Sequence, residues 1–298
     1  MGRPSARGLG YGVAAYGLWG FMPLYLKALR AVPVLEVLCH RVVWAVVFVL
    51  PLVWQQGQLT ALLAAVRRRR TLAILATSTL AIAVNWLVYI WAVVHGRVLE
   101  ASLGYYITPL VNVLLGVAIL GERLDRTVRV AVACAAVGVG WLTLRVGQPP
   151  WIALTLATSF GLYGLMRKLA PVGALAGLAI ETTLLLPFCG GYLAWAILTG
   201  HSSFLVGRPG LDVLLLLAGP VTAIPLLCFA GAARRLPLTT MGFLQYISPT
   251  LQFLLAVLVY GETFDLSRTV AFAFIWTALA VFAVYSARRG APEPVTDA

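Results

Sequence analysis

The sequence predicts an all-α membrane protein with ten transmembrane helices, arranged as two five-helix repeats of opposite orientation. Three observations support this prediction. The 298 residues are 61% hydrophobic and 11% charged, with a mean hydropathy of +0.93, far outside the composition of soluble domains. Apolar runs long enough to cross a bilayer alternate with short polar breaks. Finally, one segment of the first half reappears, in altered form, in the second half.

The apolar runs locate the predicted helices. A helix needs about 20 mostly apolar residues to cross the roughly 30 Å hydrocarbon core of a bilayer. Such runs occur at residues 9–29, 34–54, 71–94, 99–120, 128–145, 151–167, 174–199, 212–233, 238–260 and 269–287. The first run follows Arg3 and Arg7, as in a signal peptide, but no cleavage site of small residues follows it. We therefore expect it to be retained as a span.

Basic residues predict the orientation of the chain. Fifteen lie on one side of the predicted topology: Arg3, Arg7, Arg67 to Arg70, Arg123, Arg126, Arg129, Arg167, Lys168, Arg234, Arg235, Arg288 and Arg289. Six lie on the other: Lys27, Arg30, Arg97, Arg145, Arg208 and Arg268. Because cytoplasmic loops are rich in Lys and Arg, we expect both termini in the cytoplasm and the chain in the plasma (inner) membrane. The net charge of +12 then reflects topology, and no nucleic-acid partner is expected.

The repeated segment predicts how the two halves are related. Residues 106–125 read "YITPLVNVLLGVAILGERLD" and residues 246–265 read "YISPTLQFLLAVLVYGETFD", which agree at nine of twenty positions. They fall in the fourth and ninth predicted spans, so the repeat unit is five helices. An odd number of spans inverts the second unit in the bilayer. We expect one repeat at 8–146, a second at 150–287 and a cytoplasmic tail at 288–298.

Inverted repeats are typical of secondary transporters, whose substrate site lies near the midplane between the repeats. We therefore expect a permease or exporter of small amphipathic metabolites or drugs that works by alternating access. A non-transporting scaffold or regulatory partner is the alternative. No catalytic motif indicates an enzyme, and no cofactor or metal is expected. The cysteines are widely separated within apolar runs, which indicates small buried side chains: Cys39, Cys134, Cys189 and Cys228.

Ionisable residues within predicted spans are candidates for gating or coupling, because a charge in hydrocarbon is costly unless it is paired or hydrated. Glu36 falls in the first turn of the second span, with His40 one turn further on and Arg41 beside it. Glu181 lies within the seventh span. Helical rise brings Arg41 and Glu181 to similar depths, so we predict an ion pair between the halves. Snorkelling to the interface is the alternative for Glu36 and Arg41.

Polar side chains on three spans are candidates to line a substrate cavity. The fourth span carries a stripe of polar and small residues at steps of four: Glu100, Gly104, Thr108, Asn112 and Gly116. The other candidates are Gln245, Ser248 and Gln252 of the ninth span, Tyr105 of the fourth, and Asn85, Trp86 and Tyr89 of the third. Close helix packing is the alternative use of the stripe. Pro109 and Pro249 each remove a helical hydrogen bond, so we expect a bend at both.

Small residues in the fifth span, Ala131, Ala135 and Gly138, predict either close packing within the chain or a homodimer contact. Gly121 and Gly261 are expected to end helices. Asp125, and either Asp265 or Ser267, are expected to cap the helices that follow them.

Longer motifs add a resemblance to a known family. The stretches "NWLVYIWAVVHGRVLEASLGYYITPLVNVLLG" (85–116), "LPLTTMGFLQYISPTLQFLLAV" (236–257) and "LEVLCHR" (35–41) resemble the EamA family of the drug/metabolite transporter superfamily. The resemblance covers roughly residues 8–287. It implies a ten-helix permease of the plasma membrane with cytoplasmic termini and a central cavity, lined mainly by spans other than the fifth and tenth. It implies no established catalytic residues.

Overall fold

The computed structural model describes residues 6–120, 125–233, 235–236 and 238–289. The regular elements within these ranges are helices: α1 (Ala6–Ala28), α2 (Val34–Gln55), α3 (Leu59–Arg67), α4 (Arg69–Val94), α5 (Val98–Leu120), α6 (Arg126–Val146), α7 (Trp151–Leu169), α8 (Ala174–Leu198), α9 (Pro209–Leu216), α10 (Ala218–Ala233), α11 (Leu238–Leu244), α12 (Ile247–Leu254), the π-helix η1 (Leu255–Val259) and α13 (Leu266–Arg289).

Seven helical segments of the described chain are long and apolar enough to cross a membrane by length and composition. They lie in α2, α4, α5, α6, α8, α13 and the α9–α10 segment. The chain is therefore a multi-pass membrane protein. The other predicted spans correspond to α1, α7 and the interrupted segment from α11 to η1, which are helical but outside this group of seven.

The helices differ from the predicted spans in local interruptions. The short helix α3 lies between α2 and α4, where no element was predicted. The predicted ninth span is interrupted at residues 245–246, so that Pro249 falls in the first turn of α12, and it ends in η1. Pro249 has no N–H to donate to the carbonyl four residues earlier, at Gln245. In contrast, α5 continues as one helix through Pro109.

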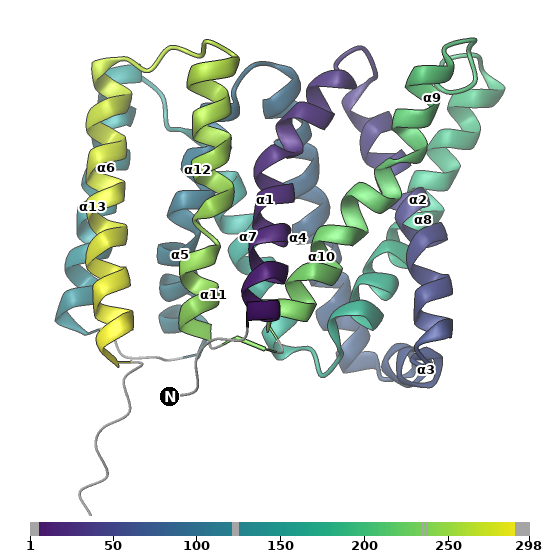
Figure 1. Cartoon of the computed structure of the whole chain (residues 1–298), viewed down its shortest axis with the longest axis horizontal. Coiled ribbons are helices and arrows are strands. Elements are labelled where there is room, and N and C mark those ends of the chain that lie inside the picture. The colour runs from purple at the N-terminus through teal and green to yellow at the C-terminus, as the bar shows by residue number, and fades with distance from the viewer. Residues whose placement is uncertain (1–5, 121–124, 234, 237, 290–298) are drawn as a thin grey trace, which may run out of the picture.

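The helices form a bundle in which α6 and α13 lie side by side at one end and α2 and α8 at the other (Figure 1). Helices α1 and α12 lie between these pairs. The start of α1 and the end of α13 are at the same face of the bundle, where α3 also lies, whereas α9 is at the opposite face (Figure 1).

The packing partners show a reciprocal pattern. Helix α7 packs against α4 and α5, and α1 packs against α10 and α12. Helices α2 and α8 pack on each other, as do α6 and α13. Each of these contacts has a counterpart if α1, α2, α4, α5 and α6 are matched with α7, α8, α10, α12 and α13, respectively. Two interlocked repeats, each contributing its first helix to the other, would produce this pattern.

Glycines allow the closest helix contacts. A Cβ atom at Gly104 of α5 would lie 2.7 Å from the backbone oxygen of Ala153 on α7. A Cβ at Gly138 of α6 would lie 3.0 Å from the backbone oxygen of Ala271 on α13. The small-residue face of the predicted fifth span is therefore filled by α13 within the same chain. Packing, one of its two predicted uses, is thus present within the chain, and the homodimer contact stays a prediction.

Two acidic side chains cap helices around the second copy of the repeated segment. Gly261 has a φ of +63°, the left-handed conformation that ends helices and favours glycine. Asp265 accepts a hydrogen bond from the N–H of Arg268 at 2.9 Å and so caps α13, as predicted. Glu262 accepts from the N–H groups of Val98 and Leu99 at 2.7 and 2.8 Å, at the start of α5. This contact ties the second half of the chain to the first.

The corresponding residues of the first copy differ. Asp125 precedes α6 as predicted, without capping it through its side chain. Gly121 lies outside the described residues.

We expect Gly104→Ala to destabilise the protein by about 1–3 kcal/mol, the usual cost of overpacking a tight contact, because the added methyl group would meet backbone rather than a mobile side chain. Gly140→Ala on α6 is the matched control, since no atom lies within 4 Å of its added Cβ. Melting temperatures in detergent would compare the two variants. Equal values would contradict the close α5–α7 contact.

A pH dependence follows from Glu262, which lies outside the membrane-spanning segments. Burial raises its pKa above the usual 4.5, against the opposing effect of its two backbone donors. The folded state therefore binds more protons than the unfolded state, and this contribution to stability falls as the pH rises from about 4.5 through the raised pKa. The advantage of the wild type over Glu262→Gln should shrink across that window in thermal melts. An advantage that grows with pH would contradict this environment.

Candidate functional site

A buried arginine lies where three helices meet. Arg41 of α2 is 4% exposed. Its Nε atom donates a hydrogen bond to Thr222 Oγ1 of α10 at 3.1 Å. Its guanidinium carbon lies 4.8 Å from the centre of the Trp86 ring of α4. The side chain is thus held by a neutral hydroxyl and an aromatic face.

Three tyrosines lie near this arginine. Tyr25, Tyr105 and Tyr89, from α1, α5 and α4, all interact with it electrostatically. The Tyr25 hydroxyl donates to the backbone oxygen of Leu214 at 2.9 Å. The rings of Tyr89 and Tyr105 meet edge to face at 5.6 Å. We call this group the Arg41 cluster: Tyr25, Arg41, Trp86, Tyr89, Tyr105 and Thr222.

Asn85 supports the cluster through Tyr105. Its Nδ2 atom donates to the Leu156 backbone oxygen and to Ser159 Oγ, both at 3.1 Å. Its Oδ1 atom accepts from the Tyr105 hydroxyl at 3.0 Å. Asn85 thereby joins α4, α5 and α7 and orients Tyr105. With its hydrogen bonds made inside the protein, Asn85 positions the cluster rather than offering free groups to a ligand.

Some buried polar atoms of this region have no hydrogen-bond partner. They include Arg41 Nη1 and the hydroxyl oxygens of Tyr89 and Tyr260. An unsatisfied buried polar group costs about 1–3 kcal/mol. Such groups are rare enough in folded proteins to need an explanation, and a polar ligand would supply one.

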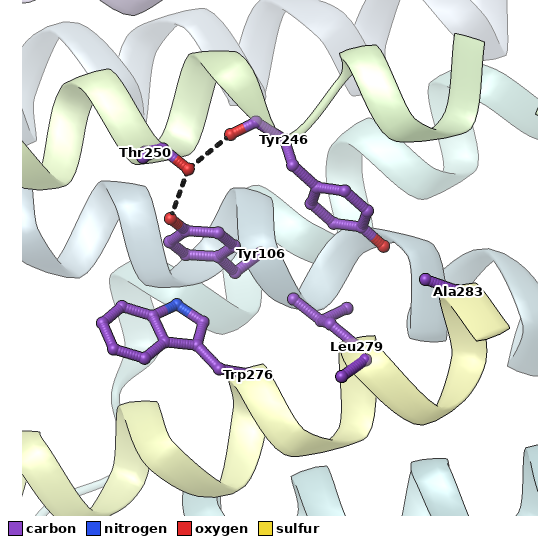
Figure 2. Close-up of a pocket in the computed structure, with 7 residues that line it drawn as sticks. Tyr106, Tyr246, Thr250, Trp276, Leu279 and Ala283 are labelled. Carbon is purple, nitrogen blue, oxygen red and sulfur yellow. Dashed lines mark hydrogen bonds between the residues drawn. The ribbon is translucent and has the colours of Figure 1, made fainter. Parts of the chain in front are cut away.

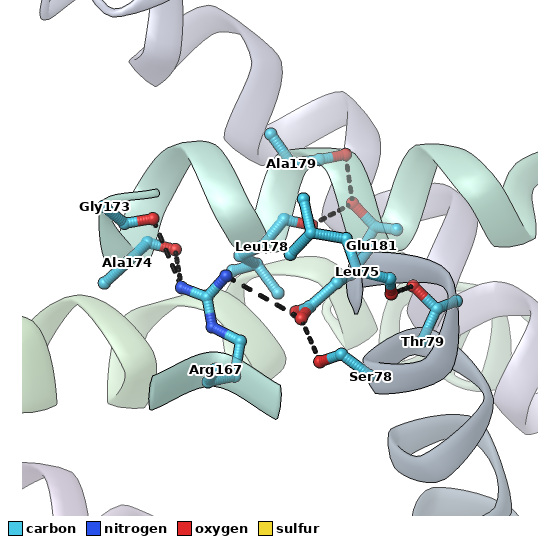
Figure 3. A network of polar contacts seen from close by, with 10 residues as sticks. Leu75, Ser78, Thr79, Arg167, Gly173, Ala174, Leu178, Ala179 and Glu181 are labelled. Atoms are coloured by element: carbon cyan, nitrogen blue, oxygen red, sulfur yellow. Dashed lines mark hydrogen bonds and ion pairs between the residues drawn. The ribbon is translucent and has the colours of Figure 1, made fainter. Parts of the chain in front are cut away.

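A second polar network joins α4, α7 and α8 (Figure 3). Glu181 of α8 is 2% exposed and accepts a hydrogen bond from Ser78 Oγ at 2.5 Å. Arg167 of α7 approaches the same carboxylate, with Nη1 3.8 Å from Oε1. Its Nη2 atom donates to the Gly173 backbone oxygen at 3.2 Å. A Cβ at Gly177 would overlap the guanidinium, so glycine there makes room for Arg167.

The predicted ion pair between Arg41 and Glu181 is therefore wrong. Arg41 faces α4 and α10, whereas Glu181 faces α4 and α7. Helical rise fixes the depth of a residue, but a contact also depends on the direction in which each helix presents it. The true partner, Arg167, is near the end of its helix, among the basic residues from which the sequence predicts only topology.

Glu36 holds the loop that follows α8. It is fully buried, and its Oε1 atom accepts from Ser202 Oγ at 2.8 Å and from the Ser203 N–H at 2.7 Å. His40 Nε2 lies 4.0 Å from this oxygen. On its other side, His40 Nδ1 accepts from Trp44 Nε1 at 3.0 Å. These contacts place the loop over the first turns of α2.

The predicted cavity residues divide into separate groups. Asn85, Trp86, Tyr89 and Tyr105 come together around Arg41. The stripe on α5 is not a common lining: Glu100 pairs with Arg97 at 3.7 Å near the start of α5, and Thr108 donates to the Gly104 oxygen of its own helix.

The rest of the predicted lining faces neighbouring helices. Asn112 is exposed, and its side-chain oxygen lies against Gly161 of α7. On α12, Gln252 donates to Ser248 Oγ at 3.1 Å and to the Trp19 oxygen of α1 at 3.3 Å. Gln245 is half-buried and bonds to its neighbour Tyr246. Packing between helices, the alternative use of these residues, accounts for most of their contacts.

A groove of about 390 Å³ lies apart from both buried networks, between α5, α12 and α13 (Figure 2). Its lining is Tyr106, Tyr246, Thr250, Trp276, Leu279, Ala280 and Ala283. The Tyr106 and Thr250 hydroxyls are 2.8 Å apart and bond to each other. The lining contains no charged side chain, so the groove offers a mainly apolar surface.

The sequence did not reveal several partners in these networks: Tyr25, Ser78, Arg167, Ser202 and Thr222. Most are common polar residues within apolar runs, and nothing in their spacing marks them. Arg167 did carry a signal, because Tyr163 precedes it by four residues and therefore lies on the same helix face. In the structure Tyr163 also bonds to Glu181.

Removing one partner of the buried pair should have unequal effects. We expect Arg167→Gln to destabilise the protein by about 3 kcal/mol or more, because it leaves a buried carboxylate without its cation. Glu181→Gln should cost less, because Arg167 is 16% exposed and keeps its backbone acceptors. Denaturation in mixed micelles would measure both, with the exposed Arg70→Gln as control. A larger loss for Glu181→Gln would contradict this arrangement.

Similarity to known proteins extends along nearly the whole chain. The EamA-like transporter family matches residues 6–144. An uncharacterized transporter of Vibrio cholerae is 47% identical, over 95% of this chain and 94% of its own. Protein RarD of Escherichia coli strain K12 is 46% identical, over 96% and 98%. A chloramphenicol-sensitive protein RarD of Pseudomonas aeruginosa is 35% identical, over 96% of both chains.

A protein of known crystal structure shares the fold, with a TM-score of 0.57 at 22% identity over 95% of this chain and 98% of its own. The full-length relatives are named as transporters or as RarD proteins. Together with the apolar helices, they show a multi-pass membrane transporter. The chain belongs to the EamA family of the drug/metabolite transporter superfamily, together with the RarD proteins.

Proposed function

We propose that this protein is a secondary transporter of small amphipathic molecules that works by alternating access. The observation that carries the proposal is the Arg41 cluster. It combines side chains of α1, α2, α4 and α5 with Thr222 of α10, so both halves contribute to it. A substrate site between two halves is the usual arrangement in transporters built from inverted repeats.

The proposed architecture is ten spans in two inverted repeats. The protein would lie in the plasma (inner) membrane, with both termini in the cytoplasm. The reciprocal packing of α1 and α7 on the opposite halves supports the repeats. The excess of basic residues on one side supports the orientation. In this topology, α1, α7 and the α11–α12–η1 segment are the three additional spans.

Alternating access needs a closure at each side of the substrate site, and α8 carries a candidate at either end. Near its start, Glu181 joins Ser78 and Arg167. Beyond its end, the loop at Ser202 is fastened to Glu36. Both closures depend on hydrogen bonds to buried carboxylates, which can exchange partners when helices move. Opening one while the other holds would expose the cluster to one side at a time.

Flux measurements with Tyr89→Phe would test the site. The Tyr89 hydroxyl has no partner within the protein, so its removal should leave the melting temperature of the unliganded protein unchanged or higher. Uptake of amphipathic probes into proteoliposomes should fall about two- to tenfold, the effect of one hydrogen bond to substrate. Chloramphenicol belongs among the probes because one relative is named for sensitivity to it.

Tyr11→Phe is the matched control, because this tyrosine is 42% exposed on α1 and lies under Arg235, away from the cluster. Unchanged flux in Tyr89→Phe would move the substrate site elsewhere. A wild-type protein that carries none of the probes would favour a scaffold or regulatory role over transport.

A further inference from the structure

The acidic side chains that the structure describes at membrane depth are committed to groups other than Arg41. Glu36 binds the loop after α8, and Glu181 binds Ser78 and Arg167. Nearer the ends of helices, Glu100 pairs with Arg97, and Glu262 caps α5. Within the described ranges, no carboxylate therefore forms an ion pair with Arg41.

Arg41 is nonetheless among the most costly residues to bury. Guanidinium remains charged in proteins, and a charge taken out of water is unfavourable unless it is paired and hydrogen-bonded. Here the fold supplies one hydroxyl acceptor, from Thr222, and the face of the Trp86 ring. Nη1 is buried without an acceptor. The compensation that the protein provides is incomplete.

We propose that Arg41 binds a carboxylate of the transported molecule, an inference that rests on the proposed transport function and narrows its substrate class. A carboxylate brings only acceptors and one negative charge, which match the unpaired Nη1 donor and the uncompensated cation. The unpaired Tyr89 hydroxyl supplies another donor within the Arg41 cluster. An ammonium group would instead meet a like charge.

The rest of the ligand is expected to be flat and apolar. Trp86 lies against Arg41, and the Tyr89 and Tyr105 rings meet edge to face beside it. Aromatic side chains of this kind bind apolar bodies, while a few placed polar groups fix the orientation. The recognised class is therefore a small aromatic or otherwise apolar carboxylate.

A purely structural role is the competing explanation, in which Arg41 only joins α2 to α10 through Thr222. The two roles differ in what a ligand does. A structural arginine affects stability equally with and without a carboxylate present. A binding arginine makes the stability depend on the carboxylate, because a ligand of the folded state raises the melting temperature by mass action.

Thermal melts of the purified full-length protein in detergent would separate these roles. The probes are sodium benzoate, benzamide and benzylamine hydrochloride, with sodium chloride alone at the same ionic strength. Benzoate should raise the melting temperature of the wild type, with a dissociation constant about tenfold or more below that of neutral benzamide. Benzamide or chloride stabilising as much as benzoate would overturn the carboxylate assignment.

Variants locate the effect. Arg41→Gln should abolish the benzoate response, and Arg41→Lys should keep a weakened one, because lysine retains the charge without the planar fork. If Arg41→Gln does not fold, Tyr89→Phe serves, with an unliganded melting temperature unchanged or higher and a smaller benzoate response. Arg145→Gln is the control, since that exposed arginine also lies over a tryptophan, 4.6 Å from the Trp141 ring. A full benzoate response in Arg41→Gln, or in Tyr89→Phe, would overturn the inference.

Flux separates this inference from the transport proposal. Suppose that the wild-type protein transports the neutral probe chloramphenicol into proteoliposomes but is not stabilised by benzoate. This result would overturn the carboxylate site and leave the transport proposal standing. Stabilisation by benzoate that depends on Arg41, without flux of benzoate or any other probe, would support the binding site and overturn transport.

Discussion

Charged side chains buried among membrane helices need partners from the protein, because hydrocarbon cannot solvate them. In this bundle α4 supplies many of those partners. Its Ser78 bonds to Glu181, its Trp86 lies against Arg41, and its Asn85 orients Tyr105. The positions of α2, α7 and α8 around α4 follow from these contacts as well as from apolar packing. One helix thus serves both the proposed closure and the proposed binding site.

The positions of the helices could be predicted from the sequence because they depend on local properties. Apolar length sets where a span occurs, and Gly261 and Asp265 mark a helix end and the next helix start through their own backbone preferences. The gathering of Trp86, Tyr89 and Tyr105 could also be anticipated in part, since a polar or amphipathic side chain in an apolar run has few stable positions. In each case the decisive information lies within a few residues.

The partners could not be predicted in the same way, because they depend on how helices face one another. Helical rise gives Arg41 and Glu181 similar expected depths, yet α2 and α8 direct them to different neighbours. Thr222 and Ser78 resemble other hydroxyl residues in the apolar runs, and Gly177 resembles other helix glycines. What distinguishes them is a contact from another helix: Arg41 on Thr222, Glu181 on Ser78, and Arg167 over Gly177. Single-sequence patterns carry no record of such pairings.

The reciprocal packing of the two halves has a consequence for biosynthesis. Helix α7 emerges from the ribosome after its partners α4 and α5, and can dock on them at once. Helix α1 is made first, but its main partners α10 and α12 are made late. The reciprocal contacts are thus completed at different times: Gly12 and Gly20 of α1 stay uncovered until Leu244 and Leu251, which contact them in the folded chain, have been made. Membrane insertion machinery that shelters a first helix until translation ends would therefore matter more for α1 than for α7.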